Sequence, residues 1–163
     1  NDASSLQTGL LPFNYEQIEL KSTCLSIIDE MKTKIKDGVS LKFVPDNNNE
    51  FYLKTDGTRL TQLLSNLLLN SIKFTDQGDI YLKYSVDEEK KEVIFTIEDT
   101  GRGIPEDMQN VIFESFQKVD VFKQGLGLGL TLVKLISTSL NGKVSIDPSY
   151  NNGTRIIFIH PIN

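Results

Sequence analysis

A strongly periodic segment between Asp56 and Thr75 sets the strictest condition on the fold of this chain. Its apolar residues recur at steps of three and four, which places them on one face of an α-helix. Thr55-Asp56 supplies a candidate N-cap directly before the segment. The sequence therefore predicts a long helix whose apolar face carries Leu60, Leu63, Leu64, Leu67, Leu68 and Ile72.

The rest of the chain alternates between helical and strand-like patterns. Three- and four-residue apolar steps predict helices, and short segments rich in β-branched and aromatic residues predict strands. Turn residues separate most of these segments, as DNNN and SYNNG do. The expected elements are a helix from Tyr15 to about Lys36, a pair of strands over Ser40 to Val44 and Glu50 to Lys54, a hairpin of Asp79 to Val86 and Glu92 to Glu98, a short helix over Glu106 to Phe113, a long helix from about Gly127 to Leu140, and a hairpin of Lys143 to Asp147 and Thr154 to His160.

This order of elements indicates the fold class. Hairpins alternate with helices and no regular βαβ series occurs, which argues against a doubly wound parallel sheet. We expect a mostly antiparallel sheet with helices on one face. With 163 residues and 39% hydrophobic residues, the chain has the size of one domain with one core.

Composition excludes several classes of function. The net charge of −5 leaves no general basic surface, so non-specific nucleic-acid binding is not expected. The single cysteine, Cys24, excludes a disulfide framework and a cysteine-rich metal site. No apolar run approaches the roughly 18 residues of a membrane span, and the start NDASSLQTG is not a signal peptide. We expect a cytoplasmic domain that makes no direct membrane contact.

Polar residues share one edge of the central helix. Asn66, Asn70 and Lys73 are spaced by four and three, and at about 100° per residue they fall within roughly 60° of one another. An amide oxygen can ligate Mg²⁺, and a neighbouring ammonium can offset phosphate charge. A solvated polar face would have the same spacing, so the pattern alone leaves both interpretations open.

Two glycine-rich segments follow the central helix. Asp99-Thr-Gly-Arg-Gly-Ile104 comes directly after a strand, where a carboxylate can accept a hydrogen bond from an exocyclic amine. Gly125-Leu-Gly-Leu-Gly-Leu130 precedes a helix, where backbone N–H groups favour phosphate. A plain tight turn and a flexible hinge are the respective alternatives. The second segment is neither a dinucleotide fingerprint nor a Walker loop, because no strand precedes it and no Lys-Ser or Lys-Thr follows it.

Taken in order, these segments resemble the N, G1 and G2 boxes of the histidine-kinase catalytic domain, a member of the gyrase, heat-shock chaperone, histidine kinase and mismatch-repair ATPase superfamily. NLLLNSIKFT, DTGRGI, IFESF and GLGLGL carry the resemblance, which extends from about Phe13 to Pro161. It implies a two-layer α/β sandwich, the Bergerat ATP-binding fold. A mixed, mostly antiparallel sheet would be covered on one face by three helices, and ATP would lie between the central helix and a lid.

The resemblance also implies roles for individual residues. Asn70 would bind Mg²⁺, and Asn66 and Lys73 would face the triphosphate as the catalytic pair. Asp99 would accept a hydrogen bond from the adenine amine. Glycines would shape the base pocket, apolar side chains would contact the base or ribose, and the G2 segment would wrap the phosphates. These further residues are Gly101 and Gly103, Phe74 and Ile104, and Gly125, Leu126, Gly127, Leu128 and Gly129.

The chain departs from the family pattern around the lid. Ser115 stands where proline is usual, and Leu126 where threonine is common. The segment between Phe116 and Gly125 is short, which predicts a compact lid of the kind found in bacterial sensor and hybrid kinases. Arg59 and Gln62 also match the family pattern and are assigned to structure.

The implied activity is transfer of the γ-phosphoryl of ATP to a histidine on a separate dimerisation domain of the same parent, with a response regulator receiver domain downstream. His160, the only histidine, lacks the acidic neighbour of an acceptor motif and is interpreted as a strand residue. Residues 1–12 would be the tail of the dimerisation region and residues 13–163 the catalytic domain. The chain alone should not phosphorylate itself, and its parent is expected to be membrane-anchored.

Two alternatives belong to other functional classes. An ATPase or serine kinase of the same fold usually carries a glutamate on the central helix, but Asn66 to Lys73 contains no acidic residue. A nucleotide-free docking module with a decayed lid would explain Leu126. The intact Asn70, Asp99 and glycines argue against it.

Overall fold

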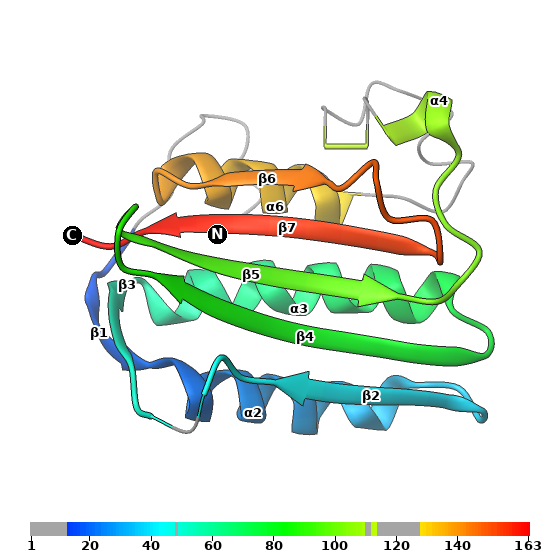
Figure 1. The fold of residues 1–163 in the computed structure, drawn as a ribbon, viewed down its shortest axis with the longest axis horizontal. Coiled ribbons are helices and arrows are strands. Elements are labelled where there is room, and N and C mark those ends of the chain that lie inside the picture. The colour runs from blue at the N-terminus through cyan, green and yellow to red at the C-terminus, as the bar shows by residue number, and fades with distance from the viewer. Residues whose placement is uncertain (1–12, 48, 110–111, 114–127) are drawn as a thin grey trace.

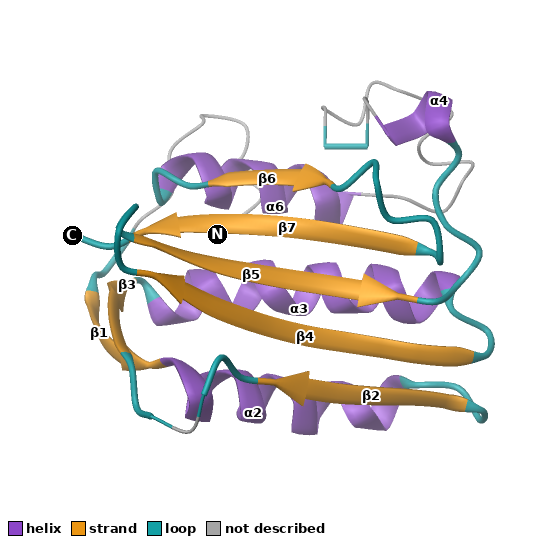
Figure 2. Ribbon diagram, in the orientation of Figure 1, coloured by secondary structure: helices purple, strands orange, loops and turns teal. Residues whose placement is uncertain are grey.

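A computed structural model describes residues 13–47, 49–109, 112–113 and 128–163. They form two layers: a five-stranded sheet, and three longer helices that cover one of its faces (Figure 1). The helices are α2 (Leu20–Met31), α3 (Gly57–Phe74) and α6 (Leu128–Ser139), with the short 3-10 helix η1 (Lys32–Lys34) and the one-turn α4 (Glu106–Gln109). Figure 2 shows how helices and strands separate into the layers, which confirms the predicted fold class.

The sheet is mixed but mostly antiparallel. Its strand order is β2-β4-β5-β7-β6, and only β2 and β4 run parallel. The strands are β2 (Val39–Val44), β4 (Gly78–Asp87), β5 (Glu92–Asp99), β6 (Lys143–Ile146) and β7 (Thr154–Pro161). Alternate residues of β4, β5 and β7 are buried, as expected for a sheet with one face on the core.

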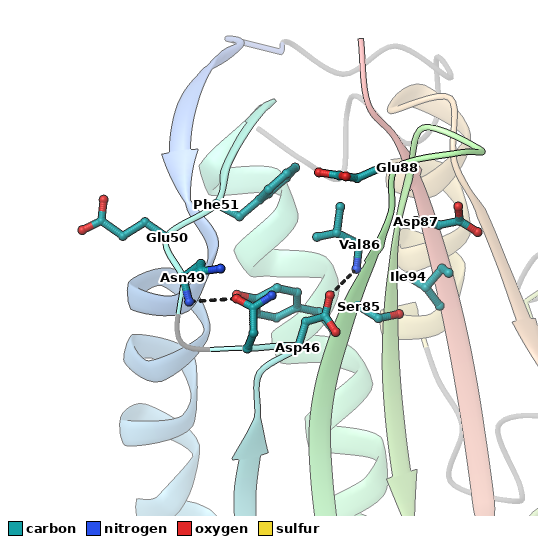
Figure 3. Close-up of a pocket in the computed structure, with 11 residues that line it drawn as sticks. Asp46, Asn49, Glu50, Phe51, Ser85, Val86, Asp87, Glu88 and Ile94 are labelled. Carbon is teal, nitrogen blue, oxygen red and sulfur yellow. Dashed lines mark hydrogen bonds between the residues drawn. The ribbon is translucent and has the colours of Figure 1, made fainter.

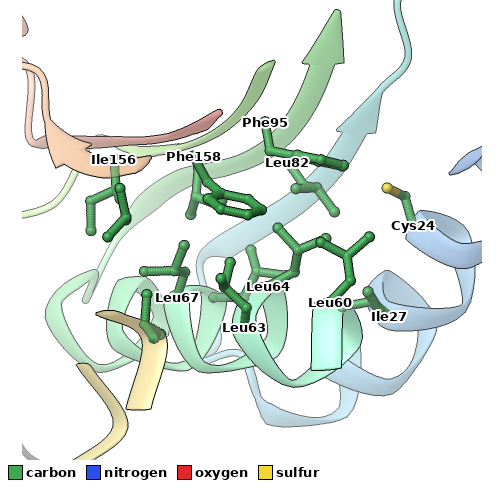
Figure 4. Packing of buried hydrophobic residues seen from close by; sticks show 14 of the residues in the cluster. Cys24, Ile27, Leu60, Leu63, Leu64, Leu67, Leu82, Phe95, Ile156 and Phe158 are labelled. Carbon is green, nitrogen blue, oxygen red and sulfur yellow. The ribbon is translucent and has the colours of Figure 1, made fainter. Parts of the chain in front are cut away.

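Helix α3 lies between α2 and α6 and supplies the centre of the core (Figure 4). Its leucines face Phe95 and Phe158, whose rings stack with centroids 5.9 Å apart. Burying each leucine stabilises the fold by about 1.5–3 kcal/mol. Asp56 caps the helix, since its Oδ1 accepts from Arg59 N at 3.0 Å. The predicted central helix and its cap are confirmed.

The amino-terminal part differs from the prediction. The first helix begins at Leu20, because Glu16–Glu19 form a strand, β1, that pairs with β3 (Tyr52–Thr55) in a separate two-stranded sheet. The Glu19 carboxylate then accepts from Lys21 N and Ser22 N, which ends the strand and starts the helix. The strands predicted on either side of DNNN exist, but they do not pair with each other.

The remaining predicted elements form, but the short helix predicted over Glu106 to Phe113 is shorter than predicted. Both hairpins form, β4 with β5 and β6 with β7, and the last helix spans Leu128–Ser139. The short helix ends at Gln109, while Ile112 and Phe113 lie in a turn. The predicted tail, residues 1–12, falls outside the described residues. Within the described part of the chain, no helix combines the length and apolarity that crossing a membrane would require.

His160 joins the two sheets. It is 1% exposed on β7, and its Nε2 lies 2.8 Å from Thr55 Oγ1 on β3, while its Nδ1 donates to Pro161 O at 2.7 Å. Burial lowers the pKa of His160. Both ring nitrogens are engaged, and the position of His160 within β7 confirms that it is a strand residue.

Candidate functional site

Three segments meet at the end of the sheet where β5 ends and β7 begins, on the right in Figure 1. They are the end of α3 with Thr75, the turn from Asp99 to Gly103, and the start of β7. Strand β5 lies next to both β4 and β7 in the sheet, and α3 crosses behind it, so segments distant in sequence converge there.

Asp99 is a buried carboxylate at this end of the sheet. It is only 2% exposed, and its Oδ1 accepts from Gly101 N at 2.9 Å and from Thr154 N at 3.2 Å. The hydroxyl of buried Ser71, on α3, also donates to the carboxylate. Burial is the dominant influence and raises the pKa of Asp99 despite these three hydrogen bonds. A carboxylate held this way is well oriented and poorly solvated, so a further donor would bind it strongly.

Glycines bring backbone close to this carboxylate. A Cβ on Gly101 would lie 2.4 Å from Phe74 O, and one on Gly153 would lie 2.2 Å from Asp99 O. Gly103 has a φ of +77°, which L side chains rarely adopt. Beside Gly101, the hydroxyl of fully buried Thr75 has no hydrogen-bond partner among the described residues. The turn therefore leaves an unsatisfied polar group next to a buried carboxylate.

The polar edge of α3 leads toward this end of the sheet. Asn66 and Asn70 are partly buried and Lys73 is exposed in the last turn. The Nδ2 of Asn70 donates to Asn66 O at 3.1 Å. This bond uses the amide nitrogen of Asn70 and does not involve its amide oxygen. An oxygen of that kind is a suitable ligand for a hard cation.

Two apolar side chains flank the turn. Phe74 is partly buried, and the guanidinium of Arg102 lies 4.6 Å from the centre of its ring. Arg102 N also donates to Phe74 O at 3.3 Å. Ile104 is partly buried against the core, and its carbonyl accepts from Gln109 Nε2 at 3.0 Å. Phe74 thus borders Gly101 and Arg102, whereas Ile104 belongs to the segment that leads into α4.

The predicted phosphate loop is only partly described. Gly125, Leu126 and Gly127 lie outside the described residues, as do Ser115 and Phe116. The backbone of Leu128 and Gly129 forms the first turn of α6, directly after that segment. The expectation that the G2 glycines wrap phosphates therefore stays a prediction.

Several residues of this end were missed by sequence reasoning. Ser71, Thr75, Gly153 and Thr154 all lie within contact of Asp99 or Gly101. Ser71 and Thr75 belong to the segment NLLLNSIKFT that resembles the N box. In that segment, only Asn66, Asn70, Lys73 and Phe74 were predicted to be site residues. Gly153-Thr154 opens the last strand, and its only sequence signal was a turn before a β-rich run.

A cavity of about 650 Å³ lies at the opposite end of the β4–β5 hairpin (Figure 3). Four acidic residues, Asp46, Glu50, Asp87 and Glu88, are among those that line it, together with Phe51, although the carboxylates of Glu50 and Asp87 point away from the other lining side chains. Asp46 Oδ2 accepts from Val86 N at 3.0 Å. This concentration of negative charge disfavours a triphosphate.

Across the described ranges, no group of three or more His, Cys, Asp or Glu side chains could hold a metal ion.

Residues 55–163 match the family model described as histidine kinase-, DNA gyrase B- and HSP90-like ATPase. The chain belongs to this ATPase family. The family match begins one residue before Asp56, the cap of α3, and runs through β7, so it includes every segment that meets at Asp99.

Curated relatives that match this chain include histidine kinases. Hybrid signal transduction histidine kinase L of Dictyostelium discoideum is 30% identical over 162 residues, which cover 94% of the chain and 10% of that protein. The chain thus spans about a tenth of this relative's length.

Solved structures agree with this assignment. Full-length ShkA in complex with AMPPNP gives a TM-score of 0.85 at 25% identity, covering 99% of this chain and 35% of that one. The catalytic domain of histidine kinase ThkA gives 0.78 at 25% identity, covering 92% of this chain and 97% of that one. ThkA in complex with the response regulator protein TrrA also matches, at a TM-score of 0.74, 25% identity, 91% of this chain and 42% of that one. The predicted kinship with histidine-kinase catalytic domains is therefore confirmed.

Proposed function

We propose that this domain binds ATP–Mg²⁺ at the Asp99 end of the sheet and supplies the γ-phosphoryl that is transferred to a histidine on a separate dimerisation domain. The observation that carries the proposal is the buried carboxylate of Asp99, oriented by two backbone N–H groups and one hydroxyl. The AMPPNP complex of ShkA supports a nucleotide, because AMPPNP is an ATP analogue.

The residues around Asp99 fit an adenine base. The carboxylate accepts from the exocyclic amine, and Gly101 and Gly103 let the flat ring approach the backbone. The buried Thr75 hydroxyl gains a partner from the base or from a water beside it, which would remove the cost of leaving it unsatisfied. Phe74 and Ile104 contribute apolar contact to the base or ribose.

The α3 edge fits the triphosphate. Asn70 offers its amide oxygen to Mg²⁺, while Asn66 and Lys73 face the phosphates. Mg²⁺ usually keeps several waters and takes few protein ligands besides substrate phosphates. Held by Asn70, the ion would offset the negative charge that develops on the phosphates during transfer. By the family resemblance, the backbone N–H groups of Gly125, Leu126, Gly127, Leu128 and Gly129 would bind the phosphates.

The acceptor histidine comes from another domain. His160 is 1% exposed and both of its ring nitrogens are engaged, so neither nitrogen is available as a nucleophile. The dimerisation domain of the same parent would supply the histidine, and residues 1–12 would belong to its end, with residues 13–163 as the catalytic domain. A response regulator would accept the phosphoryl group next, as the ThkA–TrrA complex suggests by analogy. Membrane anchoring of the parent stays a prediction.

The isolated chain should bind ATP–Mg²⁺ without labelling itself. With γ-labelled ATP we expect no alkali-stable label on this chain, and label on the dimerisation domain when that domain is added in trans. Phosphohistidine is stable in alkali, so the label can be followed after base treatment. Alkali-stable label on the isolated chain would contradict this division of roles. Steady release of labelled phosphate without any acceptor would favour the ATPase alternative.

Asn70→Ala should remove the magnesium dependence of nucleotide binding. Loss of the amide oxygen removes the protein ligand to the ion, so we expect ATP affinity in Mg²⁺ to fall by about tenfold or more, toward the affinity measured in EDTA. Calorimetric titration of ATP with and without Mg²⁺ measures both values. Asn49→Ala, an exposed asparagine at the opposite end of the molecule, is the matched control. An unchanged ratio of the two affinities in Asn70→Ala would exclude Asn70 as the ligand.

A further inference from the structure

The connection between β6 and β7 approaches the end of β5, and one of its contacts there is made by a tyrosine. Tyr150 Oη donates to the main-chain carbonyl of Asp99 at 2.9 Å, across 51 residues of sequence. Directly after the connection, Thr154 N at the start of β7 donates to Asp99 Oδ1. The connection and the start of β7 together therefore bind both the main chain and the side chain of Asp99.

The ring of Tyr150 is fixed by a charged network. The guanidinium of Arg155 lies 4.2 Å from the ring centre. Arg155 Nε lies 3.3 Å from Glu98 Oε1, and Arg155 Nη1 lies 3.1 Å from Asp147 Oδ2. Lys83 Nζ is also 3.2 Å from Glu98 Oε1. Because Glu98 and Asp147 both hold Arg155, the cation is fixed over the ring rather than free in solvent.

The connection itself is closed by short-range bonds. Asp147 Oδ1 accepts from Ser149 N at 2.9 Å and from Ser149 Oγ at 2.6 Å. Asp147 N donates to Arg155 O at 2.9 Å, and Tyr150 N donates to Asp147 O at 3.3 Å. These bonds define the position of the Tyr150 hydroxyl before any ligand arrives, so its contact with Asp99 is preorganised.

We propose that Tyr150 is a positioning residue for the base-binding carboxylate of Asp99. The inference rests on the proposed nucleotide function. The carbonyl of Asp99 belongs to the peptide that leads through Thr100 to Gly101, and Gly101 N in turn donates to the Asp99 carboxylate. Holding that carbonyl fixes the peptide, and with it the direction in which the carboxylate can accept from an amine. In this role Tyr150 would act through Asp99 and would not need to touch the nucleotide.

Tyr150→Phe tests this role, because it removes the hydroxyl and keeps the ring under Arg155. We expect ATP affinity to fall about fivefold, the effect of one net hydrogen bond. Purine riboside triphosphate lacks the exocyclic amine, and its affinity should change less than twofold. The backbone amide signals of Gly101 and Thr154 should also shift in ¹⁵N-resolved spectra without nucleotide. Tyr52→Phe, which loses a hydroxyl bonded to Glu50 at 3.3 Å on an exposed surface, should change neither measurement.

The outcomes separate this inference from the proposed function. Absence of ATP binding by the unsubstituted protein would refute the function and this inference with it. Normal ATP binding by both the unsubstituted protein and Tyr150→Phe would refute only the role of Tyr150. Equal losses for ATP and purine riboside triphosphate would also refute it, since a general loss of stability does not depend on the amine.

Discussion

Asp99→Asn should reduce ATP affinity by about a hundredfold or more and leave the protein folded. A hydrogen bond to a charged group contributes about 1.5–3 kcal/mol, and each 1.4 kcal/mol is a factor of ten in affinity. The asparagine oxygen can still accept from Gly101 N and Thr154 N. Its amide nitrogen, however, is a hydrogen-bond donor. It would face the adenine amine, which is a donor too and needs an acceptor. Calorimetric titration with ATP–Mg²⁺ measures the loss.

The same substitution should not lower stability. Burial raises the pKa of Asp99, so at neutral pH the fold carries a carboxylate whose charge burial disfavours. A neutral asparagine removes that penalty, and we expect an unchanged or slightly higher free energy of unfolding. The matched control is Asp87→Asn at the other end of the hairpin, where Oδ1 accepts from Lys90 N at 3.0 Å. ATP affinity within about threefold of the unsubstituted protein in Asp99→Asn would overturn the base site proposed around it.

Gly153→Ala should lower the free energy of unfolding by about 2–4 kcal/mol and weaken nucleotide binding as well. The φ of Gly153 is +155°, and a Cβ there would lie 2.2 Å from Asp99 O and 2.8 Å from Asp99 Oδ1. Backbone strain costs about 1–3 kcal/mol, and forcing an extra carbon into packed surroundings costs a similar amount. Relief of the contact must move either β7 or the Asp99 turn. Urea denaturation measures the stability, and ATP titration the binding.

Gly38→Ala separates the two causes of this loss. Gly38 also has a positive φ, +88°, but the nearest atom to a Cβ there is Gln77 Cγ at 3.9 Å. Its substitution therefore tests backbone strain without a close contact and should cost about 1–2 kcal/mol, with ATP affinity unchanged. Equal losses of stability in the two variants, with ATP affinity intact in both, would show that the contact between Gly153 and Asp99 is unimportant.

Local signals explain most of what could be predicted. The leucine period that gives α3 also places Asn66, Asn70 and Lys73 on one edge, because a single helix fixes both faces at once. The turn after β5 was recognisable because its glycines and Asp99 are adjacent in sequence. Turn residues likewise marked the β4–β5 and β6–β7 hairpins, whose strands follow one another directly.

Long-range contacts explain what was missed. In the two-stranded sheet, Glu16 of β1 pairs with Thr55 of β3. The helical spacing of apolar residues over 18–35 does not reveal that the start of the predicted helix is a strand. Gly153 and Thr154 reach Asp99 across more than 50 residues, so neither resembles a site residue in the linear sequence. The polar contacts of Tyr150 are hidden for the same reason.

The carboxylate of Asp99 accepts one of its hydrogen bonds from Thr154 N, at the first residue of β7. Strand β7 pairs with β5 along its whole length. A growing polypeptide on the ribosome therefore cannot complete the proposed base site until this final strand of the sheet has been synthesised and inserted. Nucleotide could then stabilise only the finished domain, and not any shorter intermediate of translation.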